Sequence, residues 1–153
     1  MDIGVDDPRA DDVRQLLGAH LAFSRAVTPE EYSFALDVDQ LVRPDVTFFS
    51  ARDGGELLGV VALKRLDPGH AELKSMHTSQ AHRRRGIGRA LAAHVLGHAR
   101  KEGYRRLSLE TGTSDDFAAA RSLYRSLGFR PCGPFGDYSA SPHNTFMTIT
   151  LVD

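Results

Sequence analysis

The sequence has little of several features that would commit it to a particular class of protein. Its 153 residues include no tryptophan, one cysteine and no apolar run long enough for a membrane-spanning helix. A single cysteine cannot form an internal disulfide, which is typical of proteins in a reducing compartment. The 19 lysines and arginines nearly balance the 20 aspartates and glutamates, so the chain lacks the positive field of a nucleic-acid-binding protein. We therefore expect no membrane and no nucleic acid among its partners.

The remaining bulk properties are those of an ordinary globular protein. Hydrophobic residues make up 41% of the chain and charged residues 25%. A chain of this length can bury a core without a metal or a disulfide. Because we find no repeat and no linker, we expect one domain over residues 1–153. The acidic amino terminus has no apolar signal region, so the expected location is cytoplasmic. The sequence leaves open whether two copies form a homodimer.

Hydrophobic periodicity and turn residues predict a chain of the α/β (α+β) class. The expected order is ααβββαβαβ, which gives a mixed, mostly antiparallel central sheet flanked by helices. The first helix begins after Asp7, and Thr28 with Glu31 forms a capping box for the second. The later helices are expected at 86–102 and from Ser114 to Gly128. Strands are expected at 46–51, 57–66, 70–78, 105–110 and 145–152, with the last strand beside 105–110.

The segment RRRGIGR, residues 83–89, lies between a predicted strand and a predicted helix. A helix amino terminus offers converging N–H groups and a partial positive charge, which suit a phosphate. Gly86 and Gly88 let an anion approach the backbone, and the arginines add charge-assisted hydrogen bonds. A solvated basic turn would explain an isolated G-x-G. Because strand, helix and charge coincide here, we predict a phosphate-binding cradle.

Two common phosphate-binding motifs are absent from this segment. A dinucleotide fold requires a third small residue at position 91, which is Leu91. The G-x-x-x-x-G-K-[ST] pattern of nucleoside triphosphate loops is also missing. Dinucleotides and nucleoside triphosphates are therefore disfavoured as ligands.

The motif Arg83-x-x-Gly86-x-Gly88 after a strand resembles the coenzyme A signature of the GNAT acetyltransferase superfamily. The downstream stretch ARSLYRSLGF, residues 120–129, resembles the superfamily's second conserved stretch, which ends in Tyr-x-x-x-Gly-Phe. The resemblance covers nearly the whole chain and implies a GNAT-like fold with acetyl-CoA as cosubstrate and no metal. It implies an N-acetyltransferase that acetylates a primary amine of a small molecule or peptide by direct transfer in a ternary complex. The alternatives are a non-catalytic coenzyme A-binding sensor and an enzyme that transfers to oxygen or uses a longer acyl chain.

The resemblance also implies roles for individual residues. The strand backbone at Met76, His77 and Thr78 would pair with the pantetheine arm and hold the acyl carbonyl. The pyrophosphate would be held by the cradle, which comprises Arg83, Arg84, Arg85, Gly86, Ile87, Gly88 and Arg89. Tyr124 matches the tyrosine that donates a proton to the departing thiolate in many members. Many members have asparagine at the position of Phe117, which we assign to packing.

Acetylation of an amine also requires a group that accepts a proton. Glu72 lies where some family members place a catalytic glutamate, and burial would raise its pKa toward neutrality. Alternatively, Glu72 forms an ion pair with Lys74, two residues along the same strand face. Glu110, His77 and an ordered water are the competing candidates for the base.

The histidines of the third helix and the cysteine are assigned to structural roles. His94 and His98 have the i, i+4 spacing of zinc ligands but no evident third ligand, so we expect a boundary position on the helix and no metal. Cys132 is expected to be a packed thiol. The acceptor pocket is expected between residues 32–39 and the loop at 132–144. Acidic residues there favour a cationic amine whereas Lys74 favours a carboxylate, which leaves the acceptor unidentified.

Overall fold

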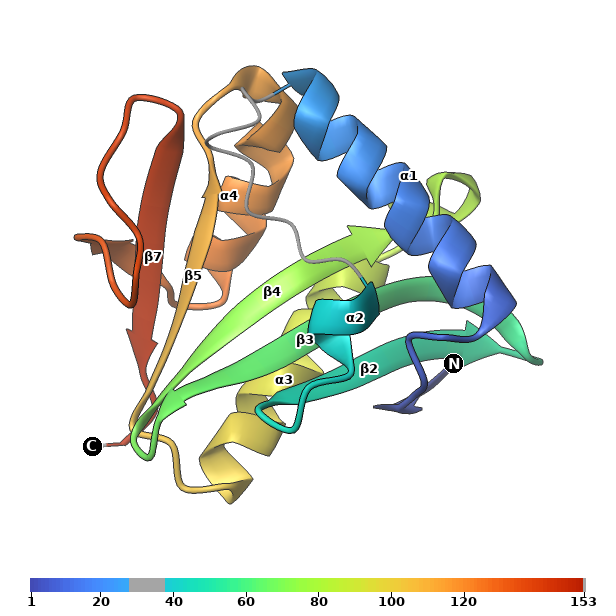
Figure 1. Cartoon of the computed structure of the whole chain (residues 1–153), viewed down its shortest axis with the longest axis horizontal. Helices are drawn as coiled ribbons and strands as arrows, with labels where there is room; N and C mark the ends of the chain where they lie inside the picture. Colours follow the sequence, from blue (N-terminus) through green and yellow to red (C-terminus); the bar gives the residue numbers. More distant parts are fainter. Residues whose placement is uncertain (28–37, 153) are drawn as a thin grey trace.

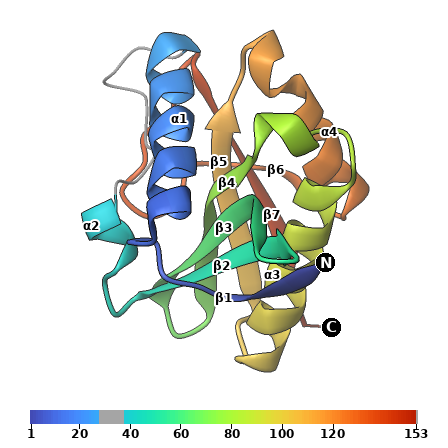
Figure 2. The ribbon, with the colours of Figure 1, turned by 90° about the vertical axis from the view of Figure 1, so that its right-hand side faces the viewer.

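The computed structural model describes residues 1–27 and 38–152, and these form a central sheet with helices on both faces (Figures 1 and 2). The described sheet has seven strands in the order β1-β2-β3-β4-β5-β7-β6. The strand pairs are antiparallel except for β4 and β5, which are parallel. This confirms the mixed, mostly antiparallel sheet. The strands are β1 (Asp2–Val5), β2 (Val46–Asp53), β3 (Glu56–Asp67), β4 (His70–Thr78), β5 (Arg106–Gly112), β6 (Arg130–Cys132) and β7 (Asn144–Thr150).

The helices divide between the two faces of the sheet, as Figure 2 shows. One face carries α1 (Asp11–Val27) and α2 (Val38–Leu41), and the other carries α3 (Ile87–Lys101) and α4 (Ala118–Ser126). Single 3-10 turns, η2 (Gln80–His82) and η3 (Asp115–Phe117), precede α3 and α4. Across residues 1–27 and 38–152, none of the helices combines the length and the apolar character needed to cross a lipid bilayer.

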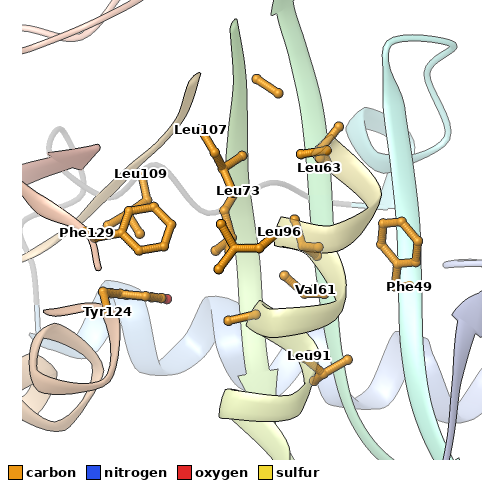
Figure 3. Packing of buried hydrophobic residues seen from close by; sticks show 14 of the residues in the cluster. Phe49, Val61, Leu63, Leu73, Leu91, Leu96, Leu107, Leu109, Tyr124 and Phe129 are labelled. Atoms are coloured by element: carbon orange, nitrogen blue, oxygen red, sulfur yellow. The ribbon is translucent and has the colours of Figure 1, made fainter. Parts of the chain in front are cut away.

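Strand alternation explains the two hydrophobic clusters. Neighbouring residues of a strand point to opposite faces, so Phe48 joins the α1 cluster while Phe49 joins the α3 cluster. Helix α3 packs Leu91 and Leu96 against the larger cluster, in which Tyr124 and Phe129 lie on the α4 side (Figure 3). The two helix histidines pack edge-on against Phe49. The ring centroid of Phe49 lies 5.2 Å from that of His94 and 5.1 Å from that of His98.

Several element boundaries differ from the sequence-based expectation. Strands β1 and β6 lie outside the predicted order, since they have four and three residues and are too short to show a periodic pattern. Helix α1 begins at Asp11 rather than after Asp7, because Asp7 binds the backbone and guanidinium of Arg9 in a turn. The helix predicted from Thr28 lies outside the described residues.

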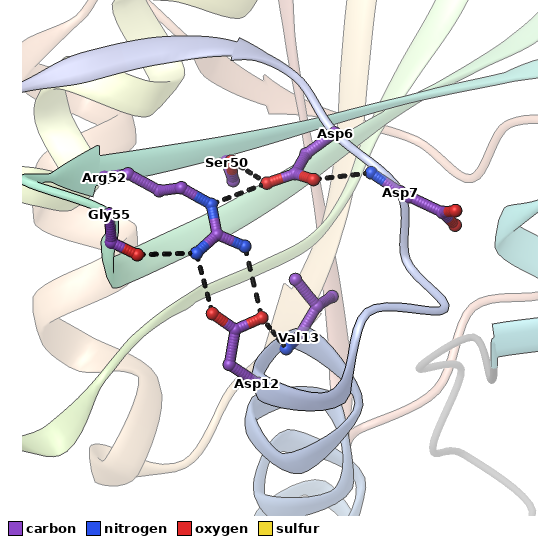
Figure 4. A network of polar contacts seen from close by, with 7 residues as sticks. All are labelled: Asp6, Asp7, Asp12, Val13, Ser50, Arg52 and Gly55. Carbon is purple, nitrogen blue, oxygen red and sulfur yellow. Dashed lines mark hydrogen bonds and ion pairs between the residues drawn. The ribbon is translucent and has the colours of Figure 1, made fainter.

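A polar network around Arg52 fastens the amino-terminal segment to β2 (Figure 4). The Arg52 guanidinium donates to Asp6 at 2.9 Å, to Asp12 at 2.7 Å and to the Gly55 carbonyl at 2.9 Å. The Ser50 hydroxyl donates to the same Asp6 carboxylate. Hydrogen bonds from Ser50 and Arg52 outweigh partial burial and lower the pKa of Asp6. The network therefore ties β1 and the first turn of α1 to the same strand.

We expect Arg52→Met to lower the free energy of unfolding by about 1 to 2 kcal/mol, because it removes charge-assisted bonds from a site that solvent screens only in part. The Arg52 and Asp6 side chains are 24% and 22% exposed. Chemical denaturation measures the change. Arg9→Met is the matched control, since Arg9 and Asp7 are 68% and 51% exposed and their loss should leave the unfolding midpoint in place. Equal midpoints for both variants would contradict a stabilising role for the Arg52 network.

Candidate functional site

The parallel strands β4 and β5 separate soon after they begin. They pair only at His70 with Arg106, Ala71 with Leu107 and Glu72 with Ser108. Beyond these pairs β4 stays with β3, whereas β5 pairs with β7 along its whole length. Figure 1 shows the carboxyl ends of the two strands diverging. We call the resulting opening between β4 after Glu72 and β5 after Ser108 the wedge.

A β-bulge lies in β4 beside the wedge. The register with β3 pairs Ala62 with Lys74 and Val60 with His77, so both Ser75 and Met76 lie opposite the single residue Val61. Ser75 has a left-handed backbone with φ of 56°. The extra residue reverses the alternation of side chains: Leu73 packs in the α3 cluster before the bulge, and Met76 packs there after it.

The predicted cradle lies at the carboxyl end of β4. Gly86 precedes α3 with a φ of 78°, a conformation that glycine adopts without strain. The first intrahelical bond runs from Ala90 to Gly86, so the amides of Ile87, Gly88 and Arg89 precede the hydrogen-bonded ladder. A Cβ on Gly88 would lie 3.5 to 3.8 Å from Leu123 of α4 and from Thr78 and Met76 of β4. The open helix end therefore adjoins both α4 and the β4 edge.

All four arginines of the cradle are exposed to solvent. Arg85 donates to the Nδ1 atom of His82 at 2.7 Å, and Arg89 donates to the Ser126 hydroxyl of α4 at 2.7 Å. Among the described residues, Arg83 and Arg84 engage no polar partner. The segment has the features a pyrophosphate requires, namely open helix amides, no side chain at Gly86 and Gly88, and several guanidinium groups.

A surface pocket of about 700 Å³ adjoins the cradle on the α1 face. Helix α1 contributes one wall, and His77, Ser79 and Arg83 contribute part of the other. The His77 side chain therefore lies on the face opposite to Met76. The structure thus places the predicted residues from Met76 to Arg89 along one path, from the β4 edge to the start of α3.

On the α1 face of the sheet, Glu72, Lys74 and Tyr138 form a closed group. Glu72 is 3% exposed and accepts hydrogen bonds from Lys74 at 3.2 Å and from the Tyr138 hydroxyl at 2.5 Å. The Lys74 ammonium also donates to the Tyr138 oxygen at 2.6 Å. Tyr138 comes from the connection between β6 and β7 and packs against Phe135 and Phe146. The ion pair between Glu72 and Lys74 that the sequence offered as an alternative is present.

Glu110 of β5 is the carboxyl beside the wedge whose pKa is strongly displaced. Burial raises the pKa of Glu110 to about 7, against the hydrogen bond from Asn144 and the charge of Lys74, which lower it. The negative charge of Glu72 adds to the increase. The Asn144 amide donates to the Glu110 carboxylate at 2.6 Å. A carboxyl group with this pKa can accept a proton at neutral pH.

Tyr124 approaches from the opposite face of the sheet. It lies on α4, is 6% exposed and packs edge-on against Phe129 (Figure 3). Burial raises the pKa of the Tyr124 phenol, and the negative charge of Glu110 raises it further. The phenol therefore stays protonated at neutral pH and can serve as a hydrogen-bond or proton donor.

Some residues of the site escaped sequence reasoning. Asn144 and Tyr138 lie in or beside a loop rich in proline and glycine, and their partners are 34 and 66 residues away. The available signal for Tyr138 was the presence of two aromatic residues, Phe135 and Tyr138, in a loop of mostly small and polar residues. Phe117 lies directly over Gly112, where a Cβ would collide with its ring, in keeping with a packing role. Cys132 is partly buried, and burial raises the pKa of its thiol.

Comparisons with known proteins identify the family and the fold. The sequence profile of the acetyltransferase (GNAT) family matches residues 12–129. The uncharacterized N-acetyltransferase YsnE of Bacillus subtilis (strain 168) is 45% identical over 99% of this chain and 100% of its own length. The IAA acetyltransferase of Azospirillum brasilense is 35% identical, with 95% and 94% of the two chains covered. A Klebsiella pneumoniae protein assigned as an acyl-CoA N-acyltransferase superposes with a TM-score of 0.83 at 27% identity, covering 99% and 97%.

The fold and the wedge thus define an acyltransferase of the acyl-CoA class. The chain belongs to the acetyltransferase (GNAT) family. It is an acetyl-CoA-dependent acetyltransferase, as its named relatives and its structural likeness show.

Proposed function

We propose that the protein transfers an acetyl group from acetyl-CoA directly to a primary amine of a small molecule or peptide, within a ternary complex. The observation that carries this proposal is the wedge, with the predicted cradle after the end of β4 and Glu110, whose pKa is raised to about 7, on β5. The protonated phenol of Tyr124 lies near enough to Glu110 for that charge to raise the pKa of the phenol. We further propose that residues 1–153 act as one domain.

We propose that coenzyme A occupies the path from the cradle to the wedge. The amides of Ile87 to Arg89 and the guanidinium groups of Arg83, Arg84, Arg85 and Arg89 would hold the pyrophosphate. Beyond Glu72, the described part of β5 no longer pairs with β4, so the backbone of Met76, His77 and Thr78 presents an open sheet edge. An extended chain carrying amides, such as pantetheine, can pair with such an edge.

Glu110 is the better placed of the two glutamates to accept the proton of the amine. Glu72 already receives hydrogen bonds from Lys74 and Tyr138, whereas Glu110 accepts one from Asn144. A base with a pKa near the working pH combines an ionised fraction with useful basicity. We assign Glu72 to holding Lys74 and Tyr138 in place, and the role of base to Glu110.

Tyr124 is the proposed proton donor to the leaving sulfur. Its raised pKa keeps the proton on the phenol until a stronger base forms nearby. Burial in the same wedge also raises the pKa of a thiol, so a departing thiolate becomes a better proton acceptor there. The pKa values of the phenol and of the leaving thiol stay matched because both groups are desolvated.

The acceptor would enter from the α1 face, where Glu72, Glu110 and Lys74 lie. Two carboxyl groups lie near a single ammonium group there, so once Glu110 is ionised a cationic acceptor would balance the second negative charge. This balance favours an amine that arrives as its ammonium form, releases one proton to solvent, and then reacts as the neutral amine.

The test of the proposed function is a thiol-release assay with acetyl-CoA against amines, amino acids, aminoglycosides and peptides. We expect release that depends on one class of amine and on the protein. Titration calorimetry with coenzyme A and acetyl-CoA measures binding separately. Binding without release for every class would instead support a coenzyme A sensor, and absence of binding at low salt would remove the proposal.

We expect Arg83→Ala to weaken coenzyme A binding about tenfold, because a charge-assisted bond to phosphate is lost. Calorimetry at two salt concentrations gives the dissociation constant and its salt dependence. The dissociation constant should increase, and its dependence on salt should become weaker. Arg100→Ala is the control, since Arg100 is an exposed arginine in the last turn of α3, at the end of that helix away from the cradle. The cradle assignment fails if Arg83→Ala and Arg100→Ala bind coenzyme A equally well.

A further inference from the structure

The hydroxyl of Ser75 stands out among the polar groups of the fold. Among the described residues, it is the one buried side-chain oxygen or nitrogen atom that has no hydrogen-bond partner. Ser75 as a whole is 9% exposed. Buried hydroxyl groups in native proteins almost always have a partner, because an unpaired one destabilises the fold. An unpaired buried hydroxyl therefore points to a partner that the protein chain itself does not supply.

The backbone of Ser75 adds an independent observation. Within the described part of the chain, two residues other than glycine have left-handed backbone, Ser75 with φ of 56° and Arg84 with φ of 65°. Glycine at position 75 would adopt this conformation without strain, and alanine would remove the unpaired hydroxyl. Backbone strain that glycine would relieve is found mainly at functional sites. The two strained residues also lie at opposite ends of the proposed coenzyme path.

The place of Ser75 identifies the group that it would meet. It immediately precedes the open edge at Met76–Thr78, and it lies in the bulge beside the wedge. Because the cradle holds the pyrophosphate at the other end of this edge, the acyl end of the coenzyme would reach Ser75. Building on the proposed function, we propose that Ser75 is a catalytic residue whose hydroxyl donates a hydrogen bond to the carbonyl oxygen of the bound acyl thioester.

The hydrogen bond matters because charge moves onto that oxygen during transfer. The nitrogen of the neutral amine forms a bond to the carbonyl carbon, and the carbon–sulfur bond breaks. One amine proton passes to Glu110, and the departing thiolate takes the proton of Tyr124. Solvent then returns both residues to their starting states. Ser75 keeps its proton throughout, and its hydroxyl stabilises the negative charge that develops on the carbonyl oxygen.

The proposal is tested by comparing two ligands that differ in the acyl group alone. Calorimetry with acetyl-CoA and with coenzyme A gives a ratio of dissociation constants for wild type and for Ser75→Ala. We expect the variant to lose about fivefold in affinity for acetyl-CoA, as for one net hydrogen bond, and to bind coenzyme A as wild type does. With the best amine of the thiol-release panel, kcat should fall by about 10- to 100-fold. An identical ratio in wild type and variant would overturn the proposal.

A second variant separates this role from a structural one. Ser75→Gly removes the hydroxyl and suits the left-handed backbone, so it should show the same loss of acetyl-CoA preference. Both variants should unfold at the same temperature as wild type or higher, because each removes an unpaired buried hydroxyl. If wild type itself binds neither ligand, the proposed function fails. If wild type binds both and the ratios in the variants match it, the inference about Ser75 alone fails.

Discussion

Tyr124→Phe should lower kcat by about 100- to 1,000-fold while leaving the dissociation constant of acetyl-CoA within about twofold of wild type. The substitution removes the phenolic proton and keeps the ring that packs against Phe129. The loss is expected in kcat because the leaving sulfur needs a proton only as the carbon–sulfur bond breaks. Steady-state kinetics with the best amine of the panel, together with calorimetry, provide the two measurements.

Tyr104 offers the matched control for this experiment. It is also a buried tyrosine, 9% exposed, and burial likewise raises the pKa of its phenol. It follows the carboxyl end of α3, away from the wedge. Tyr104→Phe should therefore keep the kcat of wild type. The proton-donor role is wrong if Tyr124→Phe turns over as fast as Tyr104→Phe.

Glu110→Gln should lower kcat/KM by at least about 100-fold and change its pH dependence. In wild type, kcat/KM should rise with pH and level off above about 7, where the Glu110 carboxyl becomes ionised. A glutamine side chain does not ionise, so the rise of kcat/KM with pH that ends near pH 7, here called the limb, should disappear in the variant. A pH series of initial rates at low substrate concentration shows the limb directly.

The pH dependence of Glu72→Gln decides whether Glu72 or Glu110 is the base that accepts the proton of the amine. If Glu110 is the base, Glu72→Gln should keep a limb near pH 7 even where its rate falls through displacement of Lys74 and Tyr138. If the limb persists in Glu110→Gln and vanishes in Glu72→Gln, the assignments must be exchanged.

Glu110→Gln should also change the free energy of unfolding. Although the substitution lowers the rate, it should increase stability at high pH. The pKa of Glu110 is raised from 4.5 to about 7 in the fold, so the native state favours the protonated form. The stability that this group contributes is complete below pH 4.5 and is lost as the pH rises through about 7. Glu110→Gln should thus match wild type near pH 4 and exceed it at pH 8, by at most about 3 kcal/mol. Denaturant unfolding at the two pH values measures the difference.

The elements around the cradle could be predicted because their signals are local. The strand 70–78 has the bounds predicted for it, and the helix predicted over 86–102 is present as α3 over 87–101. A periodic apolar stripe between Gly86 and Gly103 defines α3 without any knowledge of the rest of the fold. The short strands β1 and β6 carry no such pattern and depend on pairing with β2 and β7.

The chemistry of the wedge could be predicted only in part, because it depends on contacts between distant segments. Tyr124 and the cradle follow motifs, so their positions were visible in the sequence. Burial raises the pKa of Glu110 against the hydrogen bond from Asn144, and neither the burial nor this partner can be predicted from the residues next to position 110. The bulge at Ser75 is equally hidden, since a left-handed serine looks like any other serine in a strand.

The short pairing of β4 with β5 has one more consequence. It joins a four-stranded half of the sheet, which carries the cradle and Ser75, to a three-stranded half, which carries Glu110 and lies beside α4 with Tyr124. The groups proposed to bind the acyl-CoA thus belong to one half of the sheet, and the groups proposed to transfer protons belong to the other. Three residue pairs join these two blocks. Coenzyme bound in the wedge would bridge the blocks, and the spacing between them would set how closely the proton-transfer groups approach the thioester.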